Sequence, residues 1–369
     1  MRRLAPCWCL CYTPERLPPP DMPLERPTIT TIARQAGVSP MTVSRALRGE
    51  RYVEAQTAQR ICALARSLGY RPNPSATQLR ARRQKKAMEI REYVALLVEK
   101  QDPEWARSWK HQGFIRGMQN RAAQFGYRLQ LLWVYEPGWS IDRIAKWLHT
   151  RNVRASVLFP ENYQEIPSDV LKLVDRHSCA VVGSQPVKQP YHFAANDDFS
   201  NARNATRLAL DHRCKRPGLA VLCKIDELIG RRFSAGFRSV TQDLPPEDQI
   251  PPLLLESFDG GALRKWWEEY RPDVIITHNR RVAIEDWLRP LKLSVPKDVG
   301  WITLDIVPGD AHIAGIDPRS ELVGVAALDL VIDQMQRDES GIPDFQKGVF
   351  IEGIWQTGET LSRPRSKRA

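Results

Sequence analysis

The segment Thr28–Arg48 constrains this chain most, because its pattern specifies two short helices and the turn between them. Apolar residues recur at helical spacing over Ile29–Ala36, and Gly37 then supplies a residue that tolerates positive φ. Ser39 is a favoured N-cap residue, and Pro40 suits the first position of a second helix. Two helices joined in this way form a helix-turn-helix, the unit that places its second helix in the major groove of DNA.

The second helix turns Val43 and Leu47 inward and presents a polar, basic face elsewhere. Small hydroxyls suit phosphate anchoring, and arginine suits the reading of base edges. A third helix is predicted over Ala55–Leu68, with Gly69 as its cap. The residues on the polar face of the second helix are Met41, Thr42, Ser44, Arg45 and Arg48.

The net charge of +11 is concentrated near the amino terminus. Residues 1–86 hold 16 Lys/Arg and 5 Asp/Glu, whereas the remaining residues hold 38 of each. A solvated surface would scatter excess charge, whereas a head that binds a polyanion would gather it. Charge alone also fits a basic tail on a soluble enzyme, but the helix-turn-helix in the same segment favours a nucleic-acid partner.

With 369 residues the chain is long enough for two or three domains. It has no run of about 18 apolar residues, so we expect no membrane span and no membrane partner. The segment Cys7–Cys11 lacks a Cys-x-x-Cys pair or a nearby His, so we expect no metal and no cofactor. We expect residues 1–27 to be a disordered leader, with translation starting at Met22.

Residues 70–86 form a predicted linker, because Pro72 and Pro74 stop the third helix. One interpretation is a flexible, charged tether. The other is a segment that folds on DNA, with Leu79 wedged between base steps in the minor groove.

Two linked motifs resemble the lac/galactose repressor family of bacterial transcription regulators. They are T-I-x-x-I-A-x-x-A-G-V-S-x-x-T-V-S-R-x-L at residues 28–47 and L-G-Y-x-P-N-x-x-A-x-x-L at residues 68–79. The resemblance implies that the main major-groove readers are Pro40, Met41 and Arg45. It implies phosphate contacts from Thr28, Ser39, Thr42 and Ser44. It also implies hinge contacts from Asn73, Ala76 and Leu79.

From Tyr93 onward, strand-like and helical runs alternate, which predicts parallel sheets with helices on both faces. There are enough strands for two sheets, with a ligand between them at the carboxyl ends of the strands. The predicted strands are Tyr93–Val98, Leu129–Val134, Ala155–Phe159, Cys179–Val182, Leu219–Cys223, Val274–Thr277 and Gly300–Leu304. The predicted helices are Gly113–Gln124, Ile141–Leu148, Asn201–Asp211, Gly230–Val240, Leu263–Tyr270 and Leu322–Met335.

The resemblance continues more loosely through these runs and implies an α/β fold. The N-terminal helix-turn-helix head, residues 28–72, would be followed by a hinge helix and linker, residues 73–90. A periplasmic-binding-protein-like core of two doubly wound parallel-sheet subdomains would fill residues 91–361. The first subdomain would take about 91–190 plus 318–341, and the second about 191–317 plus 342–361. Residues 362–369 would be a basic tail.

The effector site is implied by the same resemblance. In that family a carboxylate after a late strand, matched by Asp305, helps to hold the small molecule. An arginine is expected where Phe233 stands, so either Arg231 or Arg232 has taken its role or the pocket is more apolar. Asn279 matches a polar residue at a strand end.

Two tryptophans follow the first strand of the core, where family ligands touch the protein. Trp105 and Trp109 are spaced i, i+4, which fits either contact with a ligand ring or packing between helices. The sequence leaves both interpretations open.

The resulting hypothesis is a cytoplasmic, nucleoid-associated bacterial transcription regulator, in its simplest form a repressor. A homodimer would bind double-stranded operator DNA, and a small-molecule effector, a sugar or related metabolite, would set its affinity. No nucleophile elbow, phosphate loop or zinc pair is present, so we expect no enzyme. A periplasmic-type solute-binding protein would share the core but would carry a signal peptide and no head. A nucleic-acid-processing enzyme would need a catalytic cluster in residues 90–360.

Overall fold

The chain forms two compact units in the computed structural model, residues 1–88 and residues 89–369. The structure describes residues 28–47, 53–68, 70, 92–99, 108–136, 138–257, 260–278 and 284–361. Four predicted features lie outside the described residues: the leader with Met22, the cap Gly69, the hinge and the basic tail.

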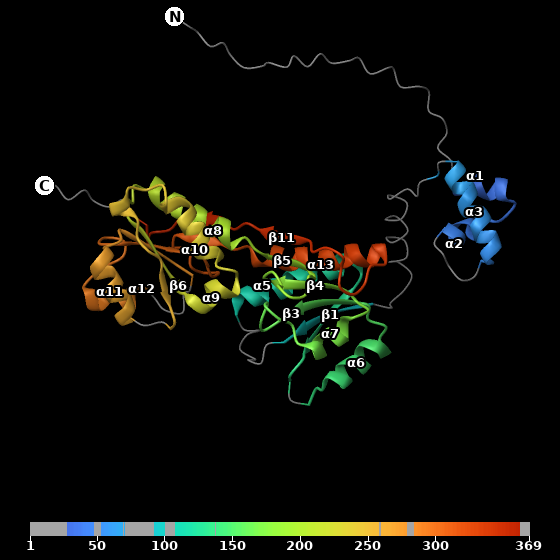
Figure 1. Cartoon of the computed structure of the whole chain (residues 1–369), viewed down its shortest axis with the longest axis horizontal. Coiled ribbons are helices and arrows are strands. Elements are labelled where there is room, and N and C mark those ends of the chain that lie inside the picture. The colour runs from blue at the N-terminus through green and yellow to red at the C-terminus, as the bar shows by residue number, and fades with distance from the viewer. Residues whose placement is uncertain are drawn as a thin grey trace, which may run out of the picture. The chain divides into compact units, whose positions relative to one another are not determined.

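Three helices form the head, α1 (Ile29–Ala36), α2 (Pro40–Leu47) and α3 (Ala55–Ser67) (Figure 1). The predicted helix-turn-helix is confirmed, and the third helix ends one residue earlier than predicted. One apolar cluster joins the three helices, because each turns a stripe of small or branched side chains inward. Its buried members are Ile32, Ala33, Ala36, Val43, Ala46, Ile61 and Ala65.

Both helices of the helix-turn-helix begin with a side-chain cap. The Thr28 hydroxyl accepts from the Thr31 amide at 3.2 Å, and the Thr31 hydroxyl accepts from the Thr28 amide at 3.3 Å. The Ser39 hydroxyl accepts from the Thr42 amide at 3.1 Å, as expected of an N-cap. Gly37 ends α1 with φ of 68°, a left-handed conformation that favours glycine.

The first core subdomain is built on an all-parallel sheet in the order β11-β5-β4-β3-β1-β2. Helices α5 (Trp109–Phe125) and α13 (Ser320–Arg337) cover one face, and α6 (Ile141–Thr150) and α7 (Ser168–Val174) the other (Figure 1). The strands are β1 (Tyr93–Val98), β2 (Arg128–Trp133), β3 (Ala155–Phe159), β4 (Ser178–Gly183), β5 (His192–Asn196) and β11 (Gly348–Ile351).

The second subdomain has the sheet order β12-β10-β9-β8-β6-β7, parallel except for the edge strand β12, which is antiparallel to β10. Alternate residues of its strands face opposite layers, as a pleated sheet buried on both faces requires. Val274 and Ile276 pack with α8 (Asp198–Asp211) and α10 (Arg232–Thr241). Ile275 packs in the opposite layer.

That opposite layer contains α11 (Gly260–Tyr270) and α12 (Ile284–Leu288), and α9 (Cys223–Leu228) follows β6. Short 3₁₀ turns span Pro246–Asp248 and Arg289–Leu291. The strands are β6 (Pro217–Leu222), β7 (Leu253–Leu255), β8 (Val274–Thr277), β9 (Gly300–Thr303), β10 (Gly315–Asp317) and β12 (Ile354–Gln356).

The chain crosses between the subdomains after β5, after β10 and after β11. The predicted crossings at 190 and 342 are therefore wrong, because β5 and β11 both pair within the first sheet. The crossing segments bond to one another. The Asn196 side-chain amide donates to Pro318 O at 2.6 Å, and Gly353 N donates to Asn201 Oδ1 at 2.8 Å.

Helices α5 and α13 approach closely because glycines face the contact. A Cβ atom at Gly324 would overlap the backbone of Phe114, and one at Gly117 would overlap the backbone of Glu321. Ion pairs flank this contact, with Arg116 Nε 2.7 Å from a Glu321 carboxylate oxygen.

We predict that Gly324→Ala destabilises the protein by about 1–3 kcal/mol, because the added methyl must push α5 away from α13. Urea unfolding of the full chain measures the effect. Gly260→Ala is the matched control, since the nearest atom to a Cβ there is 4.0 Å away. Equal stability of the two variants would show that the helix contact adapts without cost.

Candidate DNA-binding and effector sites

The exposed face of α2 carries an apolar residue beside a basic one. Met41 is 55% exposed, although methionine is usually buried, and Pro40 and Arg45 are exposed on the same helix. An exposed apolar side chain next to an arginine fits a surface that contacts base edges, including thymine methyl groups.

Of the four predicted phosphate contacts, two are exposed at helix starts, one is partly exposed and one is buried. Thr28 and Ser39 are exposed, and Thr42 is partly exposed. Ser44 is only 6% exposed, so its predicted place on the polar face is wrong. The inward face of α2 includes Ala46 as well as Val43 and is therefore wider than predicted. Arg48, Asn73, Ala76 and Leu79 lie outside the described residues.

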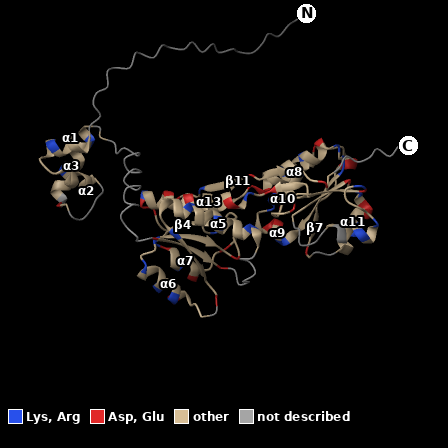
Figure 2. Cartoon of the chain, turned by 180° about the vertical axis from the view of Figure 1, so that it is seen from behind, with Lys and Arg blue, Asp and Glu red and all other residues tan. Residues whose placement is uncertain are grey.

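The described part of the head is basic (Figure 2). Within it, the arginines are Arg34, Arg45, Arg60 and Arg66, and the single acidic residue is Glu54. The Arg60 guanidinium donates to Ala36 O at 3.1 Å, so it satisfies a carbonyl at the end of α1.

In the core, titratable groups from both subdomains meet where the strands of the second sheet end. Asp305 follows β9 and His278 follows β8, so both lie at the carboxyl edge of the second sheet. Asp198 is the first residue of α8. Lys110, near the start of α5 in the first subdomain, interacts electrostatically with all three. We call this group of four residues, at the junction of the two subdomains, the cleft.

The cleft holds two carboxyl groups whose pKa values are raised above the usual value for aspartate. Burial raises the pKa of Asp198 to about 6, opposed by the nearby Lys110 and Arg232. Burial likewise raises the pKa of Asp305 to about 6, again opposed by Lys110. Burial lowers the pKa of His278 to about 3, so its imidazole is neutral at physiological pH.

Asp305 has an unused hydrogen-bonding atom. Its Oδ1 is buried and has no hydrogen-bond partner within the described structure. Its own backbone amide donates to the Thr303 hydroxyl at 3.2 Å, which fixes the turn after β9. Buried polar atoms of this kind are normally bonded, so an orphaned carboxylate oxygen in a cleft marks a place for a donor.

The structure separates the candidate arginines. Arg231 is exposed, and its guanidinium lies 3.3 Å from the Glu227 carboxylate. Arg232 turns to the first subdomain, where its Cζ lies 4.1 Å from the centre of the Phe350 ring. Phe233 is 1% exposed and packs against the His278 ring, with centroids 4.7 Å apart.

Trp105 and Asn279 lie outside the described residues, and Trp109 is the half-buried first residue of α5. Sequence reasoning missed Lys110, Asp198 and His278 as members of the cleft. The pair Asp197–Asp198 directly after a strand was the available signal. No sequence signal marked Lys110, because α5 comes to lie opposite the second sheet only in the folded core.

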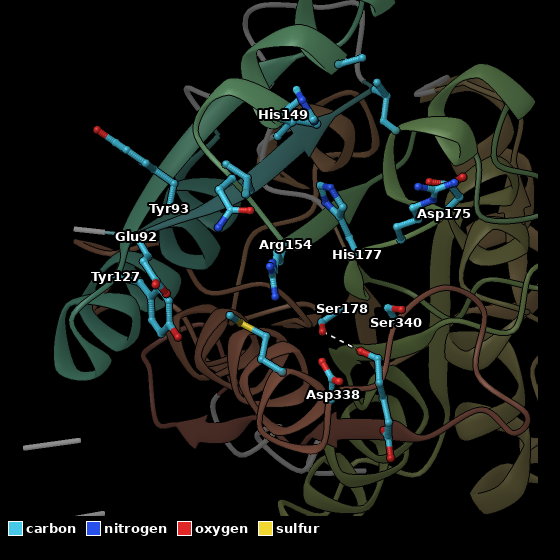
Figure 3. Close-up of a pocket in the computed structure, with 18 of the residues that line it drawn as sticks. Glu92, Tyr93, Tyr127, His149, Arg154, Asp175, His177, Ser178, Asp338 and Ser340 are labelled. Carbon is cyan, nitrogen blue, oxygen red and sulfur yellow. Dashed lines mark hydrogen bonds between the residues drawn. The ribbon is translucent and has the colours of Figure 1, made fainter. Parts of the chain in front are cut away.

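A separate hollow of about 850 Å³ lies at the amino edge of the first sheet (Figure 3). Helices α6, α7 and α13 end around it, so their last carbonyls give it negative potential. Exposed Arg154, Lys172 and Arg176 offset that potential, and the Ser178 hydroxyl donates to Glu339 O at 2.7 Å. These mixed, open surroundings lack the converging buried carboxyl groups of the cleft.

Comparison with known proteins identifies the family. The family profile described as bacterial regulatory proteins, lacI family, matches residues 28–73. The transcriptional regulator PtxS of Pseudomonas putida is 49% identical over 348 residues, covering 90% of this chain and 97% of that protein. This chain belongs to the lacI family. A shorter match, at 54% identity over 54 residues, joins 15% of the chain to 16% of the regulator GntR of Pseudomonas aeruginosa.

Solved structures agree in fold. A complex of the transcriptional regulator CelR with cellobiose matches with a TM-score of 0.58 at 19% identity, covering 91% of this chain and all of that chain. The lac repressor dimer bound to operator and the anti-inducer ONPF matches with a TM-score of 0.55 at 15% identity, covering 91% and 99%.

The lacI-family protein is thus a DNA-binding transcriptional regulator, and it is not an enzyme. The chain belongs to a family of transcriptional regulators and carries its DNA-binding head, so the hypothesis of a periplasmic-type solute-binding protein is wrong. None of the helices that the structure describes is long and apolar enough to cross a membrane.

We predict that Asp305→Asn stabilises the ligand-free protein at pH 7 and that the gain shrinks as the pH falls toward 4. The folded protein binds more protons than the unfolded chain between the unfolded pKa, near 3.8, and the folded pKa of about 6. Ionisation of Asp305 therefore costs stability as the pH rises through this window. We expect a gain of about 1–2 kcal/mol at pH 7, less than the pKa shift alone would give, because water reaches part of the carboxylate.

Thermal unfolding across this pH range measures the effect. Glu268→Gln, the same neutralisation on the exposed part of α11, is the control. A stability difference that does not change with pH would contradict the assignment.

Proposed function

We propose that this lacI-family regulator is a repressor in the bacterial cytoplasm whose operator affinity is set by a sugar or related metabolite in the cleft. The observation that carries the proposal is the orphaned, buried Oδ1 of Asp305 beside the carboxyl group of Asp198. Carboxylates accept hydrogen bonds from neighbouring hydroxyls, and the hydroxyls of a sugar supply such donors. The Phe233 and His278 rings offer apolar surface nearby.

The cleft draws its groups from both subdomains, which suggests how a ligand would act. Lys110 belongs to the first subdomain, and Asp198 and Asp305 belong to the second. A ligand bonded to both sides stabilises the closed arrangement of the core relative to the open one.

We propose that a homodimer carries two heads onto a pseudo-palindromic operator. Pro40, Met41 and Arg45 would read bases, because they lie exposed on α2. Ser44 is left out of the contact set because it is buried in the head. Phosphate contacts are proposed for Thr28, Ser39 and Thr42. Arg48 of the polar face and the hinge residues Asn73, Ala76 and Leu79 remain DNA contacts proposed from the sequence.

We predict that Arg45→Ala relaxes base preference at one position of each half-site and costs about 1–3 kcal/mol of specific binding. Selection from a random duplex library, read by sequencing, compares the variant with the wild type. Arg66→Ala on α3 is the control for the loss of one positive charge. A sequence profile unchanged by Arg45→Ala would refute its role as a base reader.

We predict that a panel of neutral and acidic mono- and disaccharides contains a ligand that raises the melting temperature of the full chain. Asp305→Asn should weaken that ligand by about 10-fold or more, because a charged acceptor contributes about 1.5–3 kcal/mol. Operator affinity without ligand should stay within about twofold. If every sugar stabilises Asp305→Asn as much as the wild type, the effector does not bind at this carboxylate.

A further inference from the structure

One contact joins the wall of the cleft to the opposite subdomain. Arg232 is the first residue of α10 in the second subdomain, and Phe350 lies in β11 of the first sheet. The Arg232 Cζ atom lies 4.1 Å from the centre of the Phe350 ring. A guanidinium at this distance from an aromatic face is held by the quadrupole of the ring.

Neighbouring residues hold the backbone at Arg232 and the ring of Phe350 in place. The fully buried Asp226 accepts hydrogen bonds from the amides of Phe233 and Ser234, at 3.1 and 3.2 Å, and so anchors the start of α10. The Phe350 ring packs edge-on against the buried Phe193, with centroids 5.2 Å apart and planes at 73°. The contact therefore connects two rigid elements rather than two loose side chains.

The guanidinium also belongs to the electrostatics of the cleft. Asp198 lies within its range, and the positive charge of Arg232 opposes the rise in the Asp198 pKa that burial causes. Lys110, Asp305 and Asp197 act on the same carboxyl group. Phe350 precedes the third crossover by only two residues. The Phe350 ring thus holds the Arg232 guanidinium close to the third crossover between the subdomains.

We infer that Phe350 is a positioning residue for the effector cleft. Its ring sets the place of the Arg232 guanidinium and ties α10 to the first sheet, so that movement of the subdomains and the position of this charge are coupled. The part of the inference that concerns the effector rests on the proposed function. The contact between ring and guanidinium does not.

A double-mutant cycle on the full-length protein tests the contact without any ligand. The variants are Phe350→Leu, which keeps apolar bulk but removes the ring, Arg232→Gln, and the double variant. We expect the unfolding constants to be non-additive by about two- to fivefold, the range for a partly exposed cation–π pair. Phe350→Tyr should restore the wild-type coupling, because it keeps the aromatic face.

Phe345→Leu is the matched control. This phenylalanine lies just before the same strand, is 65% exposed, and contacts Lys347 and His192 of its own subdomain instead of Arg232. Its cycle with Arg232→Gln should be additive. Additive behaviour of Phe350→Leu as well, or equal losses in Phe350→Leu and Phe350→Tyr, would overturn the inference.

A spectroscopic signature separates positioning from simple packing. The Nε–H proton of Arg232, assigned by its loss in Arg232→Gln, should be shifted by the ring in the wild type and in Phe350→Tyr. It should return to an ordinary position in Phe350→Leu. An unshifted wild-type proton would contradict the contact.

The effector readout uses the panel sugar that stabilises the wild type most. We expect Phe350→Leu to weaken that sugar about three- to tenfold, with Phe345→Leu and Phe350→Tyr within twofold of the wild type. If no sugar binds, the proposed function fails while the cycle still measures the contact. If a sugar binds Phe350→Leu as well as the wild type, Phe350 has no part in effector binding.

Discussion

The core depends on the way its chain passes three times between two sheets. Because β5, β10 and β11 each end at the junction, three crossing segments join the two subdomains, and any rotation of one subdomain against the other must take place in those segments. The bonds from Asn196 to Pro318 and from Gly353 to Asn201 link separate crossings to one another. A cleft that closes by such a rotation brings the same few groups together each time, which is what a selective site requires.

The sequence predicted elements whose signals are local. The bounds of α1 and the start of α2 were correct because Thr28, Gly37 and Ser39 are caps whose chemistry acts within one turn. β1, β3 and β8 were also found at their observed bounds, since short apolar runs between polar residues mark buried strands. Ser44 was misplaced because two inward residues were read as the whole buried stripe of α2.

Long-range pairing could not be predicted in the same way. A strand such as β11 shows its extended character in sequence but not the sheet that it joins, so the subdomain boundaries were set on the wrong side of β5 and β11. The residues of the cleft were also predictable only where a local motif marked them. Asp305 was found through a family motif, whereas Lys110 acts only because folding places α5 against a distant sheet. The different surroundings of Arg231 and Arg232 likewise arise from tertiary contacts that the sequence does not show.

The hydroxyls at the two helix starts of the head have a consequence for how tightly DNA can be held. In the free protein Thr28 and Ser39 already accept hydrogen bonds from backbone amides, and the Ser39 and Thr42 hydroxyls lie 2.9 Å apart. A phosphate oxygen would accept from the O–H group of such a hydroxyl and would replace water or the neighbouring hydroxyl there, and such exchanges contribute little net free energy. The larger contribution must then come from counterions released by the arginines of the head. Operator occupancy would therefore follow the ionic strength of the cell, and the bases would decide the location of binding more than its strength.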